Sequence, residues 1–191
     1  MPTPAPLARR DVVNALYLDE LLGKRPSKFD DLPASRLVRI RVDRAGATMA
    51  PLVDSAIAGH FFDFPAINER FAGSSSSCSR AVRFVWGLGA ARPTLVANQI
   101  VKLDVRGQPG QHRTFALPHT TPGEPIFVER PGATAEDDGA LLSWCNNDLD
   151  GTSSLVVLDA ASLQLMTRLD CPVGLPYGFH GVWLPATVQP T

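Results

Sequence analysis

Apolar and polar residues alternate with a period of two along much of the chain, most clearly in residues 37–43 (LVRIRVD) and 81–87 (AVRFVWG). Because successive side chains of a β-strand point to opposite faces, this period predicts half-buried strands. Further short strands are predicted between turn-forming residues at 99–105, 113–117, 125–128, 140–144, 154–158, 165–169 and 182–184. The pattern favours an all-β protein built as an antiparallel sandwich, a barrel or a propeller.

One segment follows a helical period instead. In residues 11–24 (DVVNALYLDELLGK) the apolar positions can share one face of a helix. Asp11 suits the N-cap, and Gly23 suits the end of the helix. We therefore expect a short helix here, with its apolar face packed against the core.

Three strand ends carry an aspartate directly before a turn, at Asp43, Asp104 and Asp159. Aspartate suits this place because its side chain can bond the backbone two residues further on. Such a unit, recurring at similar intervals, is what successive propeller blades produce, although typical intervals are nearer ~40–50 residues. Ordinary hairpin chemistry explains the repetition equally well.

The charge balance and the composition narrow the function classes. The 191 residues fit one domain, and 18 basic against 19 acidic side chains leave a net charge of −1. Without a basic block, the chain lacks the electrostatic footprint of a nucleic-acid-binding protein. No apolar run reaches the ~18 residues of a membrane span, and residues 1–10 lack the apolar stretch of a secretory signal.

The cysteines and histidines do not form a recognisable site by their spacing. Cys78, Cys145 and Cys171 are widely separated without a C-x-x-C pair, so we expect free thiols in a reducing compartment. None of the four histidines lies in an H-x-x-x-H or H-E-x-x-H pattern. The sequence also lacks a G-x-S-x-G, a P-loop and a G-x-G-x-x-G.

Three segments place an ionisable residue in apolar surroundings. Asp63 lies between aromatic residues in FFDFPAINER, Glu124 precedes a predicted strand in GEPIFVERP, and His180 lies between Phe179 and Gly181 in PYGFHGVW. Acids and imidazoles in such surroundings are candidates for site chemistry. Buried residues satisfied by backbone hydrogen bonds would give the same pattern.

Taken together and in this order, the three segments resemble the C-terminal half of the carotenoid cleavage oxygenase family, which includes the retinal pigment epithelium isomerohydrolase. FDFPAIN resembles the acid-F-P-x-I-N motif of that family, and GEPIFVERPGATAEDDGALLS resembles its E-P-I-F-V segment followed by an acidic D-D-G turn. LVVLDAASLQLMTRLDCPVGLPYGFHGVW resembles its last hairpin and terminal F-H-G motif. The resemblance covers nearly the whole chain from about Asp11.

The resemblance implies an iron site on a propeller axis. The fold would be a seven-bladed β-propeller, of which this chain forms about the last three blades. A non-haem iron(II) would be held by four histidines, with His180 matching the last of them and the other three preceding this chain. His60, His112 and His119 match no ligand motif.

Two acids would support the ligands. Glu124 and Asp63 match carboxylates that accept a hydrogen bond from a ligand imidazole, which orients the ring. The family usually has glutamate where Asp63 stands, and aspartate is one methylene shorter. We expect His180, Glu124 and Asp63 to converge at one inward-facing end of the sheets.

The resemblance implies a dioxygenase that uses O2 to split a double bond of a carotenoid or apocarotenoid. We expect residues 1–191 to form one partial propeller domain, with 1–10 disordered, whose partners include the missing N-terminal blades. Cytoplasm and plastid both suit such a protein, and peripheral membrane contact stays open.

Two alternatives to the enzyme are kept. One alternative is a catalytically inactive short propeller or binding protein that lacks three of four iron ligands. An unrelated β-rich binding domain is the other.

Overall fold

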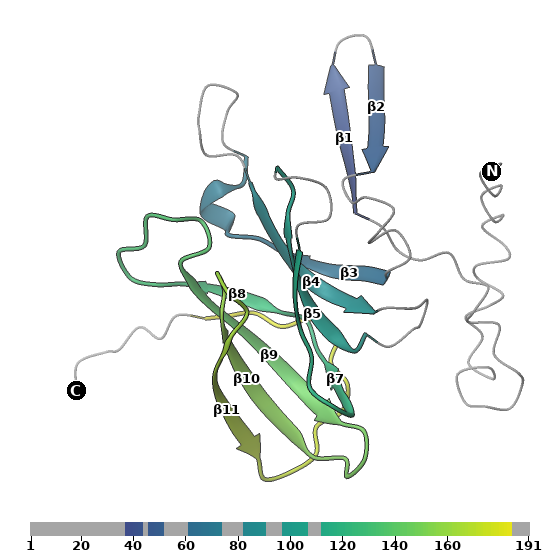
Figure 1. The fold of residues 1–191 in the computed structure, drawn as a ribbon, viewed down its shortest axis with the longest axis vertical. Coiled ribbons are helices and arrows are strands. Elements are labelled where there is room, and N and C mark those ends of the chain that lie inside the picture. The colour runs from purple at the N-terminus through teal and green to yellow at the C-terminus, as the bar shows by residue number, and fades with distance from the viewer. Residues whose placement is uncertain are drawn as a thin grey trace, which may run out of the picture.

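The computed structural model describes residues 37–43, 46–51, 61–73, 82–90, 97–106 and 112–184. Within these ranges the chain forms strands β1–β11 and one short 3-10 helix, η2 (Glu69–Phe71) (Figure 1). The predicted all-β class is therefore confirmed. The helix predicted over residues 11–24 and the disorder predicted for residues 1–10 lie outside the described residues.

The strands form three antiparallel sheets. A hairpin joins β1 (Val38–Asp43) to β2 (Gly46–Pro51). The second sheet, named the β3–β6 sheet, has the spatial order β3 (Phe61–Ala66), β4 (Phe84–Ala90), β5 (Gln99–Asp104), β6 (His112–Phe115). The third, named the β7–β11 sheet, has the order β11 (Leu165–Cys171), β10 (Ser153–Asp159), β9 (Gly139–Asn147), β7 (Thr120–Pro122), and β8 (Ile126–Glu129) also pairs with β9.

The connectivity is that of propeller blades. Strands β3 to β6 each pair with the next strand of the chain, as do β9 to β11. Blades of a propeller are four-stranded antiparallel sheets of this kind, packed face to face around an axis. The described residues thus form a part of a propeller, and the two larger sheets, which are drawn in Figure 1, share one buried cluster.

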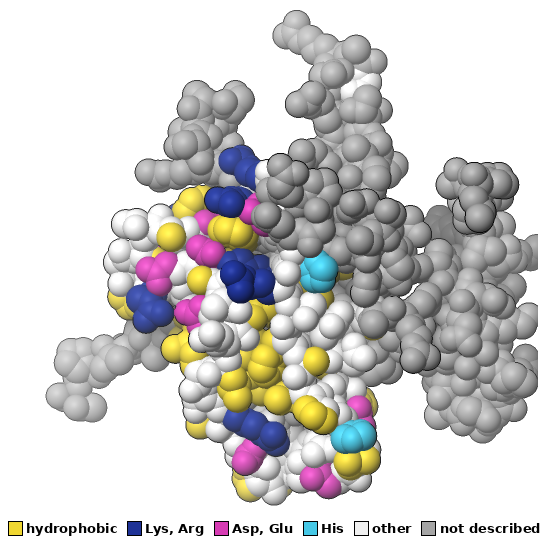
Figure 2. Space-filling model, viewed as in Figure 1, with side chains coloured by type: hydrophobic (Ala, Val, Ile, Leu, Met, Phe, Trp, Pro, Cys, Tyr) yellow, Lys and Arg dark blue, Asp and Glu magenta, His cyan; other side chains and the backbone are white. Residues whose placement is uncertain are grey.

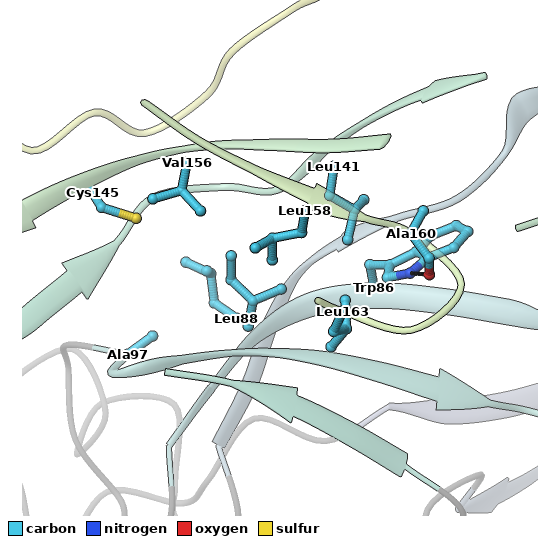
Figure 3. Close-up of a cluster of buried hydrophobic side chains, with 10 residues drawn as sticks. Trp86, Leu88, Ala97, Leu141, Cys145, Val156, Leu158, Ala160 and Leu163 are labelled. Carbon is cyan, nitrogen blue, oxygen red and sulfur yellow. Dashed lines mark hydrogen bonds between the residues drawn. The ribbon is translucent and has the colours of Figure 1, made fainter. Parts of the chain in front are cut away.

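The core lies between the two larger sheets. Trp86 and Leu88 of β4 are buried against Leu141 of β9 and Leu158 of β10 (Figure 3). The Trp86 ring stacks on Phe127 with the ring centroids 4.8 Å apart. The indole N–H of Trp86 donates to the buried carbonyl of Ala160 at 3.0 Å, so the one polar atom of this ring is satisfied.

A second, smaller cluster lies on the other face of β4. It consists of Phe62, Val85, Val101 and Leu103. Both faces of β4 are therefore buried, and this strand lies in the interior of the described structure.

One face of the β7–β11 sheet is exposed by contrast. It carries Trp144 and Leu169, which are 47% and 56% exposed. Figure 2 shows apolar side chains gathered over this sheet in the lower half of the view.

An acidic turn between β8 and β9 joins the two sheets. The carboxylate of buried Glu136 accepts the backbone N–H groups of Arg83 (2.8 Å) and Phe84 (2.9 Å) at the start of β4. The next residue, Asp137, forms an ion pair with Lys102 of β5 at 2.6 Å, and Lys102 is only 6% exposed. Its ammonium group also donates to the carbonyl of Ala161. The turn therefore fixes the two sheets by directional bonds in addition to apolar packing.

The three repeated aspartates end β1, β5 and β10, as predicted. Asp104 accepts the N–H of Arg106, two residues on, at 3.0 Å. Asp159 accepts the hydroxyl and the N–H of Ser162, and the hydroxyl bond lowers the pKa of Asp159. Each aspartate ends a strand of a different sheet, which favours the blade interpretation of the repeat over isolated hairpin chemistry.

Several strand boundaries differ from the predictions. Strand β4 begins at Phe84 instead of residue 81, and β9 extends to Asn147. The strand predicted over 182–184 is wrong, because this segment has no regular structure and its apolar side chains are exposed. Strands β2, β3 and β7 were not predicted: β3 contains Pro65, which is tolerated because β3 is an edge strand.

We expect Glu136→Ala to lower the free energy of unfolding by about 3 kcal/mol, because it leaves two N–H groups of β4 without their acceptor. Urea unfolding would measure this as a lower midpoint. Exposed Glu69 provides the control, since Glu69→Ala should change the free energy by no more than about 0.5 kcal/mol. Equal effects of the two substitutions would contradict a role of Glu136 in joining the sheets.

Candidate functional site

The candidate site lies where an exposed C-terminal segment meets the beginning of β8. Residues 172–184 follow β11 without regular secondary structure, and we call this segment the C-terminal strap. It carries His180, whose side chain is 74% exposed. Glu124, directly before β8, is 20% exposed and faces it.

Backbone bonds and a buried proline position Glu124. The N–H of Gly123 donates to the carbonyl of Trp144 at 2.6 Å, and the hydroxyl of Ser143 donates to the carbonyl of Gly123 at 2.8 Å. On the other side, Pro125 is fully buried and has a fixed φ. The segment before β8 is therefore attached to β9, which leaves Glu124 little backbone freedom.

The Glu124 carboxylate contacts His180 at two points. Nδ1 of the imidazole lies 3.3 Å from both Oε1 and Oε2, and the N–H of Gly181 donates to Oε2 at 2.9 Å. A carboxylate at Nδ1 assigns the proton to this nitrogen, which leaves the lone pair on Nε2.

Gly181 allows this close approach. A Cβ built at this position would lie 2.8 Å from Cδ1 of Ile126, the first residue of β8. Glycine at this position therefore avoids a contact that a larger residue could relieve only by a shift of the Ile126 side chain.

Asp63 reaches the site through its neighbour, Phe64. Phe64 has φ of +50° at an irregularity in the pairing of β3 with β4. Its N–H donates to Oδ1 of Asp63 at 2.9 Å, a local bond that supports this rare conformation. The Phe64 ring lies 5.4 Å from the His180 ring and 5.7 Å from the Phe179 ring, measured between centroids.

The structure thus brings two of the three expected residues into contact, His180 and Glu124, and links the third to them by an aromatic ring. Contact of the Asp63 carboxylate with another ligand imidazole stays a prediction. Phe64 was not identified from the sequence, because its positive φ has no signature in FDFPAIN. Only the proline after it hinted at an irregular strand.

Other ionisable groups lie apart from this pair. His112 is on β6, His119 precedes β7, and His60 lies outside the described residues. In the described part of the chain, no group of three or more His, Cys, Asp or Glu side chains could hold a metal ion. Burial raises the pKa of the Cys145 thiol, so this residue is a neutral part of the core. The described ranges also contain no helix long and apolar enough to cross a membrane.

Blade-like sheets with a carboxylate-supported histidine on the C-terminal strap define part of a propeller with a candidate functional site. The family model described as retinal pigment epithelial membrane protein matches residues 5–185. The chain therefore belongs to this family, the carotenoid cleavage oxygenases.

Individual relatives agree with this assignment. The chain is 36% identical over 181 residues to carotenoid cleavage dioxygenase 8 homolog A, chloroplastic, of Oryza sativa subsp. japonica, covering 93% of this chain and 31% of that protein. It is 34% identical over 164 residues to the apocarotenoid-15,15'-oxygenase of Synechocystis, covering 83% and 31% respectively.

A solved structure shares the fold. The crystal structure of cobalt-substituted Synechocystis apocarotenoid oxygenase aligns with a TM-score of 0.71 and 30% identity, over 83% of this chain and 32% of that one. The chain thus spans about a third of the length of the relatives it matches.

We expect Asp63→Ala to disturb the His180 ring through Phe64. Without the local acceptor, the positive φ of Phe64 loses its support and the ring moves from the imidazole. NMR should show the imidazole proton resonances of His180 shifting, and the free energy of unfolding should fall by about 1 kcal/mol.

Asp63→Asn is the matched control, because its Oδ1 still accepts the N–H of Phe64. It should leave the His180 resonances near their original positions. If Asn disturbs them as much as Ala does, the charge of Asp63 matters more than the local bond.

Proposed function

We propose that this chain is the C-terminal portion of a non-haem iron(II) dioxygenase that oxidatively cleaves a double bond of a carotenoid or apocarotenoid. The observation that carries the proposal is the pairing of His180 Nδ1 with Glu124. A histidine that binds a metal through one ring nitrogen commonly donates its other N–H to a carboxylate. The names of the matched dioxygenases support the reaction class.

The residues present fit one part of an iron site. Neutral imidazole is a suitable iron ligand, and Glu124 holds the Nδ1 proton so that Nε2 can bind. A cobalt-substituted form of a matched relative supports a metal ion in this family. Three further histidines would come from a part of the enzyme that precedes this sequence, as the resemblance implies.

Around the ligand, the chain offers apolar surface. The rings of Phe64 and Phe179 lie beside the imidazole of His180 and contact each other. Bound iron(II) would supply the activation of O2, which the amino-acid side chains here do not provide. Apolar rings beside the ligand suit a conjugated polyene and disfavour water next to the metal. The contact with Glu124 would keep the imidazole of His180 oriented while the metal ion is bound.

A binding protein without iron is the second candidate. It is favoured by the single imidazole in the described part of the site, because one ligand cannot match the affinity or geometry of four. Such a protein would keep the fold and the aromatic surface. The chloroplastic names of two matched plant proteins favour a plastid over the cytoplasm for either candidate.

The size and metal content of the native protein separate these candidates. An antibody against this chain should detect a band well above 20.5 kDa, and the purified protein should contain iron and cleave an apocarotenoid only with O2 present. A single band at 20.5 kDa without bound iron would contradict the dioxygenase and leave the binding protein.

Substitutions in that native protein assign the ligand. We expect His180→Ala to remove bound iron and Glu124→Gln to weaken iron binding by about 10- to 100-fold, because the imidazole loses its orienting carboxylate. Metal analysis after dialysis measures both effects. His112→Gln on β6 should retain iron, and full iron content in His180→Ala would exclude His180 as a ligand.

A further inference from the structure

Burial does not hold the C-terminal strap in place. Tyr177 and Phe179 are 64% and 78% exposed, and Val182 and Leu184 are exposed to a similar degree. Apolar packing of these residues against the described sheets is therefore slight. A specific position for His180 must depend on directional contacts of the strap.

Three hydrogen bonds supply those contacts, on both sides of His180. The N–H of Leu175 donates to Oγ of Ser153 at 2.7 Å, and the hydroxyl of Tyr177 donates to Oδ1 of Asp148 at 2.9 Å. The N–H of Gly181 donates to Glu124, as described above. Two of the three acceptors thus lie at the connection between β9 and β10: Asp148 is in the turn, and Ser153 is the first residue of β10.

A glycine brings the strap onto the same turn. A Cβ built on Gly174 would collide with the carbonyl oxygen of Gly151. Backbone cannot yield as the end of a side chain can, so position 174 requires glycine for this approach. Gly178, four residues further along the strap, has open space around its Cβ position.

The turn itself is firmly built. The hydroxyl of Thr121 on β7 donates to both oxygens of Asp148, and the N–H of Asp148 donates to the carbonyl of His119. Within the turn, Asp150 accepts the N–H and the hydroxyl of Thr152. The side chain and the backbone of Asp148 are therefore both held by bonds that do not involve Tyr177.

We propose that the turn between β9 and β10 is the dock that places His180, with Asp148 and Tyr177 as its positioning residues. Tyr177 is three residues from His180, and the Gly181 bond lies directly after it, so the imidazole is held between two anchors. The bond to Asp148 also raises the pKa of Tyr177, which keeps its hydroxyl a donor. That the imidazole positioned by this turn is a metal ligand rests on the proposed function.

Hydrogen exchange and NMR of the 191-residue chain test the dock without iron. We expect Tyr177→Phe and Asp148→Ala each to increase the exchange rate of the Gly181 amide by about five- to tenfold, the effect of losing one hydrogen bond. The imidazole resonances of His180 should shift in both variants. Amides of β10 serve as the internal reference and should keep their exchange rates.

Two matched pairs separate positioning from general stability. Asp148→Asn keeps an oxygen acceptor for Tyr177 and Thr121, so it should leave the exchange rate of the Gly181 amide near that of the unsubstituted chain. Gly174→Ala should act as Tyr177→Phe does, whereas Gly178→Ala should have no effect.

The proposal is overturned if Tyr177→Phe and Gly174→Ala leave Gly181 exchange and the His180 resonances unchanged, or if both change only together with the β10 amides. These readouts do not depend on iron. A native protein without iron would therefore refute the dioxygenase but not the role of the turn in placing His180. Conversely, an iron-containing native protein together with unchanged Gly181 exchange in the variants would refute the role of the turn but not the dioxygenase.

Discussion

The Glu136 carboxylate accepts two consecutive N–H groups at the start of β4, and the placement of the two larger sheets depends on this contact. Those N–H groups lie where a strand that is buried on both faces begins, and their acceptor is a buried carboxylate. The adjacent Lys102–Asp137 pair acts in the same way, since a nearly buried ammonium group needs its carboxylate and carbonyl acceptors. Apolar packing around Trp86 brings the sheets together, and these polar contacts add directional bonds between them.

The candidate site inherits its geometry from that placement. Phe64 comes from the β3–β6 sheet, Glu124 from the segment before β8, and His180 from the strap, so the three meet only when the sheets are correctly joined. A small shift between the sheets would move the Phe64 ring relative to the imidazole without changing the Glu124 contact. The aromatic and the carboxylate contacts of His180 are thus under separate structural control.

The sequence predicted those features that depend on neighbouring residues. Alternation located β1 and β4, short runs between turn-forming residues located β5, β10 and β11, and the aspartates marked strand ends through local side-chain bonds. Features created by tertiary contact were missed. The apolar residues of 182–184 resembled a strand but are exposed, and Tyr177 and Asp148, 29 positions apart, carry no shared motif. Glu124 and His180 were singled out as ionisable residues in apolar surroundings, but only the family resemblance supplied the expectation that they converge.

Asp63 illustrates how one methylene changes what a carboxylate can do. A glutamate at this position, the usual residue by resemblance, would carry its carboxylate farther from the backbone and toward another side chain. The aspartate is short enough to accept the N–H of the next residue, and Phe64 adopts φ of +50° there. A non-glycine residue in this region needs such local support, which costs the carboxylate one of its acceptor positions. The shorter acid is therefore linked to His180 through the Phe64 ring, and any direct role toward a second imidazole would use its remaining lone pairs.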